Sequence, residues 1–236
     1  YDTVIGEAAS GNDNPYDGDL DEVSFWSKVL SQEEITVLYN NKNLQDLPSI
    51  TSGTATTTVG IADSSGLHDI EGQLITATLA SDSLGSSADG TDAGGISWQQ
   101  NTVANLGYSW YADGGGSAYV DIGTKWNASL LEEFTYSWWL KPTSLSGNQI
   151  WFDASDFSGS NFGIGCRNSN SDGDILCKES NGGDSYWQIS VDDGVDSGSW
   201  QHFILTRDST GAYLYKDNEL IGSETSFTGS VSTEST

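Results

Sequence analysis

The sequence contains no methionine, and basic side chains are scarce throughout its 236 residues. Eight Lys and Arg residues face 34 Asp and Glu residues, which gives a formal net charge of −26 at pH 7. A chain this acidic repels nucleic acid and anionic membrane surfaces, so we expect neither as a partner. The same charge favours solubility in salt and the binding of divalent cations such as calcium. A solvated acidic surface is the simpler explanation, because it requires no specific site.

Long apolar runs and targeting signals are also missing. No stretch approaches the length of a bilayer-spanning helix, and no signal peptide is present, so we expect no membrane insertion. Because the chain starts at Tyr1 and has no methionine, we expect a processed subunit or a piece of a longer array. Hydrophobic residues make up 36% and aromatic residues 11%, which suffices for a packed core and argues against disorder throughout.

Cysteine and histidine are too scarce for a zinc site. Cys166 and Cys177 each lie beside a strand-like run, and the polar stretch between them is typical of a hairpin. His68 and His202 are far from both cysteines in the sequence. We therefore expect a cross-strand disulfide, in keeping with an extracellular composition.

The stretch from Pro15 to Tyr39, PYDGDLDEVSFWSKVLSQEEITVLY, predicts a strand followed by a short helix. The strand residues follow the turn signal Asp17-Gly18. Ser31 and Glu34 form a capping box at the start of the helix. One apolar face follows at helical spacing, formed by Ile35, Leu38 and Tyr39. Two asparagines then end the helix, which we expect over residues 32–40.

The rest of the chain predicts short antiparallel strands. Residues 3–6 indicate a strand, and residues 41–59 an extended linker. From Tyr108 onward, strand-like runs alternate with Gly, Asn and Asp turns. In Phe134–Pro142, the alternation places Phe134, Tyr136 and Trp138 on one face. This spacing of strands and turns favours an all-β sandwich of two antiparallel sheets.

These motifs resemble the laminin G-like and pentraxin-like jelly rolls of the concanavalin A-like group. Gly18–Asp21 is similar to the family's G-D-hydrophobic-D closing strand, which is followed by L-S-x-E-E-I and a Tyr. Residues 134–142 resemble F-T-x-x-x-W-x-K-P, and residues 199–225 resemble the Trp-x-His strand and its following hairpins. The resemblance implies a two-sheet jelly roll with one short helix.

The order of the motifs is unusual. The family closes its domain with the strand and helix that here occupy residues 1–40. Family order is restored when residues 60–236 are followed by residues 1–40, with residues 41–59 as the connection. Three arrangements remain open: a circularly permuted domain, one period of a tandem array, or donation of residues 1–40 to a neighbouring copy. Because an incomplete sandwich exposes strand edges and apolar core, we expect a repeating or polymeric assembly.

The resemblance also implies candidate calcium ligands. A pentraxin-like site between two loops would use the oxygen-bearing side chains of Asp13, Asn14, Asp156 and Asn161. A second arrangement sets Asp63, in the D-S-S-G turn, against Asp21 or Glu22 on the closing strand. Asp, Asn and Gly also favour turns for backbone reasons alone, so each loop is equally well explained without an ion.

Glycan binding is the common role of the resembled family, and it uses aromatic side chains that stack on a sugar face. The candidates for this role are Trp110, Tyr111, Trp151, Tyr186 and Trp187. Tyr186 and Trp187 follow a Gly-Gly-Asp loop, so we expect this pair to be exposed. Most of the nine tryptophans are expected in the core.

We expect a protein that is not an enzyme. The acidic stretch Asp19–Glu22 lacks the spaced carboxylates of the glycosidase pattern E-x-D-x-x-E. His202 falls inside a strand-like run, which indicates a structural role. No nucleophile elbow, phosphate-binding loop or dinucleotide fingerprint is present. A hydrolase would need a carboxylate pair that the sequence does not offer.

The leading hypothesis is an extracellular structural or adhesive protein, built of repeated laminin G-like domains that assemble into a filament or long surface fibre. Its partners would be other copies of itself, at a cell or virion surface. The alternative is a calcium-dependent carbohydrate-binding module of a phage fibre or secreted protein. Residues 127–129, Asn-Ala-Ser, form a glycosylation sequon that has meaning in a eukaryotic secretory host.

Overall fold

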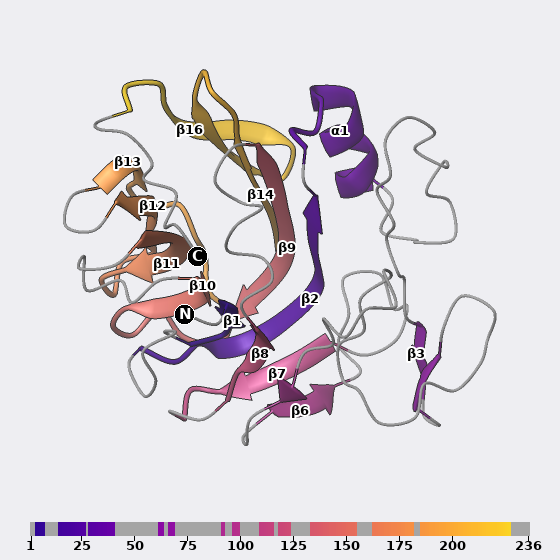
Figure 1. Cartoon of the computed structure of the whole chain (residues 1–236). Coiled ribbons are helices and arrows are strands. Elements are labelled where there is room, and N and C mark those ends of the chain that lie inside the picture. Colours follow the sequence, from indigo (N-terminus) through magenta and orange to yellow (C-terminus); the bar gives the residue numbers. More distant parts are fainter. Residues whose placement is uncertain are drawn as a thin grey trace.

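The structure is a computed structural model. It describes residues 3–7, 14–26, 28–40, 61–63, 66–68, 91–92, 96–99, 109–115, 118–123, 133–154, 162–181 and 185–227. The strands of these residues form two antiparallel sheets of seven strands each, and a separate two-stranded sheet (Figure 1). The expected all-β, two-sheet sandwich with a short helix is therefore confirmed.

The first sheet has the strand order β13-β12-β11-β10-β1-β8-β5. Its strands in chain order are β1 (Thr3–Ile5), β5 (Thr91–Asp92), β8 (Val120–Gly123), β10 (Gln149–Asp153), β11 (Phe162–Ser169), β12 (Asp174–Asn181) and β13 (Ser185–Val191). Strand β1 lies inside this sheet, with Val4 opposite Asp153 of β10 on one side and Asp121 of β8 on the other.

The second sheet has the strand order β16-β15-β14-β9-β2-β7-β6. Its strands in chain order are β2 (Asp17–Trp26), β6 (Ile96–Gln99), β7 (Ser109–Asp113), β9 (Phe134–Pro142), β14 (Gln201–Arg207), β15 (Ala212–Lys216) and β16 (Glu219–Glu224). Strand β2 pairs with both β7 and β9, so it also lies inside its sheet. The two-stranded sheet pairs β3 (Ile61–Asp63) with β4 (Gly66–His68).

The core between the sheets follows from side-chain alternation in β9. Phe134, Tyr136 and Trp138 all belong to the central apolar cluster, as the sequence pattern predicts. Trp138 stacks on Phe203 of β14 with ring centroids 5.8 Å apart, and its centroid lies 5.9 Å from that of Trp151 on β10. Full burial of each of these aromatic side chains stabilises the fold by roughly 2–3 kcal/mol. Aromatic rings from both sheets therefore hold the layers together.

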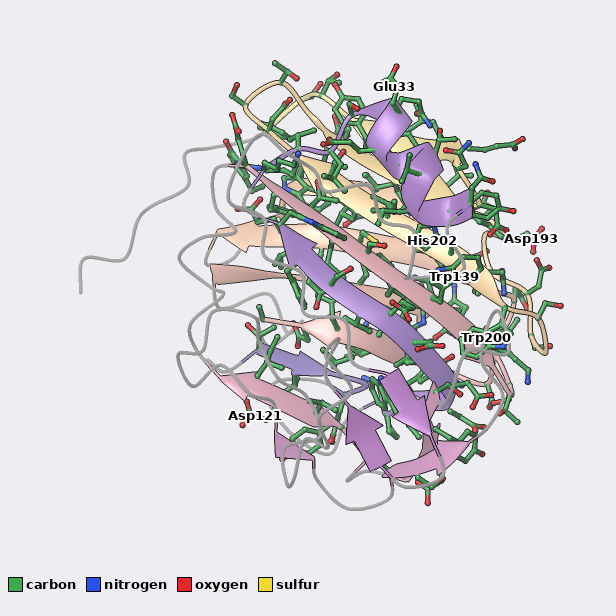
Figure 2. The ribbon with its side chains drawn as sticks, turned by 90° about the vertical axis from the view of Figure 1, so that its right-hand side faces the viewer. Glu33, Asp121, Trp139, Asp193, Trp200 and His202 are labelled. Carbon is green, nitrogen blue, oxygen red and sulfur yellow. A yellow bond between two sulfur atoms is a disulfide. The ribbon has the colours of Figure 1, made fainter. Side chains whose placement is uncertain are left out.

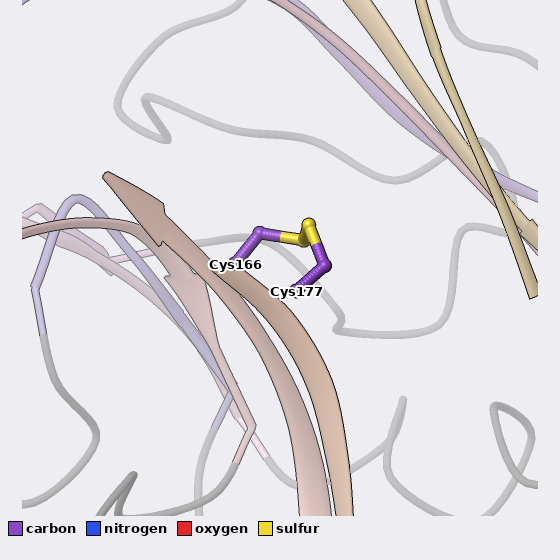
Figure 3. Close-up of a disulfide and its surroundings, with 2 residues drawn as sticks. All are labelled: Cys166 and Cys177. Atoms are coloured by element: carbon purple, nitrogen blue, oxygen red, sulfur yellow. A yellow bond between two sulfur atoms is a disulfide. The ribbon is translucent and has the colours of Figure 1, made fainter. Parts of the chain in front are cut away.

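The predicted disulfide is present. Cys166 on β11 and Cys177 on β12 are directly opposite in the strand register and are joined by a bond between their sulfur atoms (Figure 3). Both side chains are fully buried on the core side of the first sheet. The turn between the two strands, residues 170–173, is polar, as the sequence indicates.

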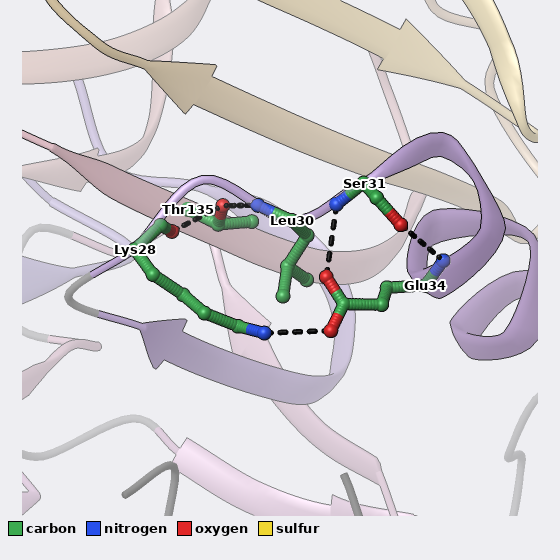
Figure 4. Close-up of polar contacts among 5 residues, drawn as sticks. All are labelled: Lys28, Leu30, Ser31, Glu34 and Thr135. Carbon is green, nitrogen blue, oxygen red and sulfur yellow. Dashed lines mark hydrogen bonds and ion pairs between the residues drawn. The ribbon is translucent and has the colours of Figure 1, made fainter. Parts of the chain in front are cut away.

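Helix α1 (Gln32–Asn40) lies on the outer side of the second sheet, and it has the predicted capping box. The amide of Glu34 donates to Ser31 Oγ at 3.3 Å, and the amide of Ser31 donates to Glu34 Oε2 at 2.9 Å (Figure 4). Lys28 Nζ donates to the other carboxylate oxygen of Glu34. Ile35, 1% exposed, packs in a second apolar cluster with Trp26 and Ile204. The helix is thus fixed to the sheet by its apolar face.

Candidate functional site

The most unusual feature of the fold is the position of its first residues. We call the described residues 3–7, 14–26 and 28–40 the N-terminal unit; they include β1, β2 and α1. This unit supplies an internal strand to each sheet, between β8 and β10 in the first and between β7 and β9 in the second. Figure 1 shows these indigo strands crossing among strands from much later in the chain. Without the unit, both sheets would be split and four strand edges would be exposed.

The surface that receives the unit is built to recognise β2. Lys141 on β9 is opposite Asp19, and its Nζ lies 3.5 Å from Asp19 Oδ2. Ser109 Oγ on β7 donates to Asp19 Oδ1 at 3.2 Å. Asp19 is 4% exposed, and burial of a carboxyl group is costly unless polar partners surround it, as these do from both neighbouring strands. Leu20, the next residue, points to the opposite face and is buried in the core.

Glycine occupies position 18 of the G-D-hydrophobic-D motif for a steric reason. Its φ of +154° lies in a region that side chains disfavour, and an added Cβ would come within 2.5 Å of the carbonyl oxygen of Lys141. The hydroxyl of Tyr16 would be only 2.6 Å from that Cβ, and this hydroxyl already donates to the carbonyl of Asp19. Glycine is required here because β2 passes close to β9 and to the buried Tyr16 ring.

Helix α1 covers a histidine on the outer side of the second sheet. The ring of His202 on β14 stacks against Trp139 of β9 at 4.8 Å and against Tyr39 of α1 at 6.1 Å. Figure 2 shows Trp139 and His202 together on this face, beside the helix. His202 Nε2 lies 2.8 Å from Ser137 Oγ, and the residue is 2% exposed. Burial lowers the pKa of His202 to about 3, so the imidazole is neutral at pH 7.

A second buried polar group joins the two sheets. Glu179 on β12 accepts a hydrogen bond from Trp187 Nε1 on β13, and its Oε2 lies 3.5 Å from Arg207 Nε on β14. The guanidinium of Arg207 lies 5.5 Å from the Tyr186 ring centroid and 5.4 Å from that of Phe227. Burial raises the pKa of Glu179 to about 7, and the nearby Arg207 opposes this effect only in part.

The raised pKa of Glu179 predicts a pH-dependent stability. The folded-state pKa of Glu179 lies above its ordinary value of 4.5, so the contribution of this carboxyl to the free energy of unfolding is fully present below pH 4.5. That contribution is lost as the pH rises through about 7. We expect Glu179→Gln to remove this loss, because glutamine does not ionise. Between pH 5 and pH 8, the variant should gain about 2 kcal/mol in unfolding free energy relative to the unchanged protein. Urea unfolding at both pH values measures the difference; parallel stability curves would contradict the prediction.

The structure describes three of the six predicted calcium ligands. Asp13, Asp156 and Asn161 lie outside the described residues. Asn14 is half-buried with φ of +61°, and its carbonyl oxygen accepts a hydrogen bond from the amide of Ile150. Asp63 ends β3 of the two-stranded sheet, whereas Asp21 lies on β2 and accepts from the amide of Glu22. Within the described ranges, no three His, Cys, Asp or Glu residues are grouped to hold a metal ion. Calcium binding stays a prediction.

The expectation that Trp151 and Trp187 stack on a glycan is wrong. Trp151 is 1% exposed and Trp187 is 2% exposed, and both are members of the core cluster. A shift in register between Ile150 and Phe152 turns both Trp151 and Phe152 toward the core. Trp187 faces inward because it is opposite Glu179 and follows the same side of β13 as Ile189. Tyr186 is half-buried and stacks on Phe227 at 5.0 Å.

The strand predicted around His202 is confirmed as β14, whereas the roles of Glu179 and Arg207 were not predicted from the sequence. The alternation of side chains along a β-strand, which repeats every two residues, could have predicted both inward positions. Counting from the inward Cys177 places Glu179 inward, and counting from Phe203 through Leu205 places Arg207 inward. Opposite charges at inward positions of strands in different sheets indicate an inter-sheet ion pair. The partner of Tyr39 had no sequence signal, because helix α1 and β14 are far apart in the chain.

In the described ranges, every helix falls short of the length and apolar character needed to span a bilayer.

Comparison with known proteins identifies the family. A model of the laminin G-like family in the concanavalin A-like lectin/glucanase superfamily matches residues 113–236. Neither curated proteins nor solved structures gave a match. The matched residues contain β8 to β16, whereas β1, β2 and α1 lie outside them. Because the match spans more than half of the 236 residues and the fold agrees with it, the chain belongs to the concanavalin A-like lectin/glucanase superfamily as a laminin G-like domain.

Proposed function

We propose that this protein is an extracellular adhesive or structural domain whose copies join when the N-terminal unit of one copy completes the sandwich of another. A laminin G-like domain fits adhesive or carbohydrate-binding roles. The observation that carries the proposal is the place of β1 and β2, each an internal strand of one sheet. Residues 41–60 alone connect the unit to the following strand β3, so it can be exchanged without breaking any other connection.

The energetics of exchange follow from the contacts. The unit buries Ile5, Tyr16 and Leu20 in the core, and Ile35 against the outer face. These contacts would be identical whether the receiving surface belongs to the same copy or to another. The balance between the closed domain and a linked chain of domains is therefore set by the connection and by protein concentration. A filament would form from repeated exchange in one direction, because each copy both donates and receives one unit.

Carbohydrate binding is the alternative, and it is supported by the family alone. The aromatic residues Trp151 and Trp187, which would stack on a sugar, are buried. We also propose that the domain is not an enzyme, since the one buried Ser–His contact described here, between Ser137 and His202, is covered by Tyr39. A glycan array with and without EDTA tests the alternative. Saccharide binding that EDTA abolishes, from a protein that stays monomeric, would favour it over self-assembly.

A cysteine cross-link tests whether the N-terminal unit pairs with its own copy or with another copy. Ser24 on β2 is directly opposite Ser137 on β9, so the double variant Ser24→Cys/Ser137→Cys can form a disulfide between the unit and its receiving strand. If units are exchanged, mild oxidation at high protein concentration will give a ladder of covalent oligomers on a non-reducing gel. If every unit closes its own domain, oxidation will give cross-linked monomer only, and the proposal is wrong.

The matched control is the pair Tyr213→Cys/Ser223→Cys. These residues are opposite each other in the hairpin of β15 and β16, which a single copy always forms by itself. Oxidation of the control should give monomer in both cases. A ladder from the control would show that random collision, rather than exchange, produces the oligomers.

A further inference from the structure

His202 is held in an environment that accepts only its neutral form. Its ring packs against the aromatic rings of Trp139 and Tyr39, which also stack on each other with centroids 5.9 Å apart, and its Nε2 faces the hydroxyl of Ser137. Trp139 is 5% exposed and His202 is 2% exposed, so the histidine ring is shielded from water, whereas Tyr39 is half-buried. Tyr39 belongs to the last turn of α1, and it is the contribution of the N-terminal unit to this stack.

The charged and titratable groups near the His202 ring do not stabilise the positive charge of a protonated imidazole. In the turn after β15, Asp217 Oδ1 accepts a hydrogen bond from the main-chain amide of His202 at 3.0 Å. On β2, Asp21 is opposite Trp139, one strand beyond the histidine. On α1, Glu33 and Glu34 are in the first turn, at the opposite end of the helix from Tyr39. On β15, Tyr215 packs beside the second apolar cluster. A positive imidazole would therefore be buried beside two aromatic rings and a hydroxyl.

We propose that protonation of His202 releases helix α1 and the attached β2 from the second sheet, so that mild acid frees the N-terminal unit for exchange. The physical reason is that a charged imidazole must reach water, and Tyr39 with its helix is the cover that stands between them. The release concerns the same docking surface as the proposed function, but it holds whether the unit closes its own domain or that of a neighbour.

The direction of the effect follows from linkage. Burial lowers the pKa of His202 to about 3 in the closed state, and the ordinary pKa of histidine is 6.5. The contribution of the closed stack is thus fully present above pH 6.5 and is lost as pH falls toward 3. With these two values, the opening equilibrium of α1 rises about 10-fold from pH 7.5 to pH 5.5, and about 100-fold at pH 4.5.

Amide hydrogen exchange of the full chain measures the opening. Peptides covering residues 28–40 are followed at pH 7.5, 5.5 and 4.5, with intrinsic exchange rates corrected for pH. The unchanged protein should lose protection of α1 about 10-fold and then about 100-fold. His202→Gln should show no such loss, because glutamine keeps a polar contact for Ser137 and does not ionise. Glu179→Gln, which removes a carboxyl with a raised pKa in the core between the sheets, should keep the full acid response.

Two outcomes overturn the inference: acid-independent protection of α1 in the unchanged protein, or an unaltered acid response in His202→Gln. Because His202→Gln alone can fail to fold, NMR titration of the histidine rings in the unchanged protein is the second test. The His202 ring, assigned by comparison with His68→Gln, should titrate only together with loss of the α1 signals. Titration near pH 6.5 with α1 still in place would refute the mechanism. Neither readout depends on oligomers, so failure here is distinct from a monomeric result in the cross-linking experiment.

Discussion

A chain that begins at residue 41 should not fold, and it should recover its fold when residues 1–40 are added as a separate peptide. Removal of β1 and β2 splits both seven-stranded sheets and exposes the core that Leu20 and Tyr16 cover. Because a typical domain is stabilised by only about 5–15 kcal/mol, we expect the loss of two internal strands with their buried side chains to unfold the chain. Near-UV circular dichroism, which reports packed tryptophans, should be absent for the truncated chain and restored by the peptide.

Two variant peptides sharpen this experiment. Leu20→Asp places a charge at a position that is 1% exposed, so this peptide should fail to restore the signal. Asp21→Asn changes a half-buried residue on the outer face, and this peptide should restore the signal almost fully. A truncated chain that unfolds cooperatively by itself would show that residues 41–236 form a complete sandwich. That result would remove the basis of the proposed exchange.

The second large effect is expected from the disulfide. The double variant Cys166→Ala/Cys177→Ala should lower the free energy of unfolding by about 3 kcal/mol, since the bond closes a loop with a sequence separation of 11 residues. Both cysteines are fully buried in the core, so the alanines also remove sulfur contacts. Guanidinium unfolding monitored by tryptophan fluorescence measures the change.

The control for the disulfide variant is the unchanged protein in strong reductant. If the reductant reaches the buried bond, the reduced protein should approach the variant in stability. Equal stability of the variant and the oxidised protein would show that the hairpin of β11 and β12 needs no covalent link. The eight cross-strand pairs of that hairpin would then suffice.

Local features were predictable from the sequence because their causes are local. The capping box of Ser31 and Glu34 sets the start of α1, and the helix occupies residues 32–40 as expected. Alternation predicted the face of Phe134, Tyr136 and Trp138 in β9, whose bounds are those of the motif. The two cysteines lie opposite each other because the polar stretch between them is a hairpin turn. The family was also predictable, from motif order read across the two ends of the chain.

What the tertiary structure alone decided depends on pairing between distant strands. Trp151 seemed free to face solvent, but a register shift in β10 turns it into the core. His202 is neutral because it is buried, and one of the rings packed against it, Tyr39, comes from a helix more than 160 residues earlier in the chain. The central positions of β1 and β2 likewise depend on which strands pair with them. Backbone hydrogen bonds form between neighbouring strands whatever their separation in the sequence, so the sequence does not indicate these partners. The sequence by itself determined β1, β2, the strands from β7 onward, the helix and the bond between cysteines; the small strands β3 to β6 and the place of the N-terminal unit required the assembled sheets.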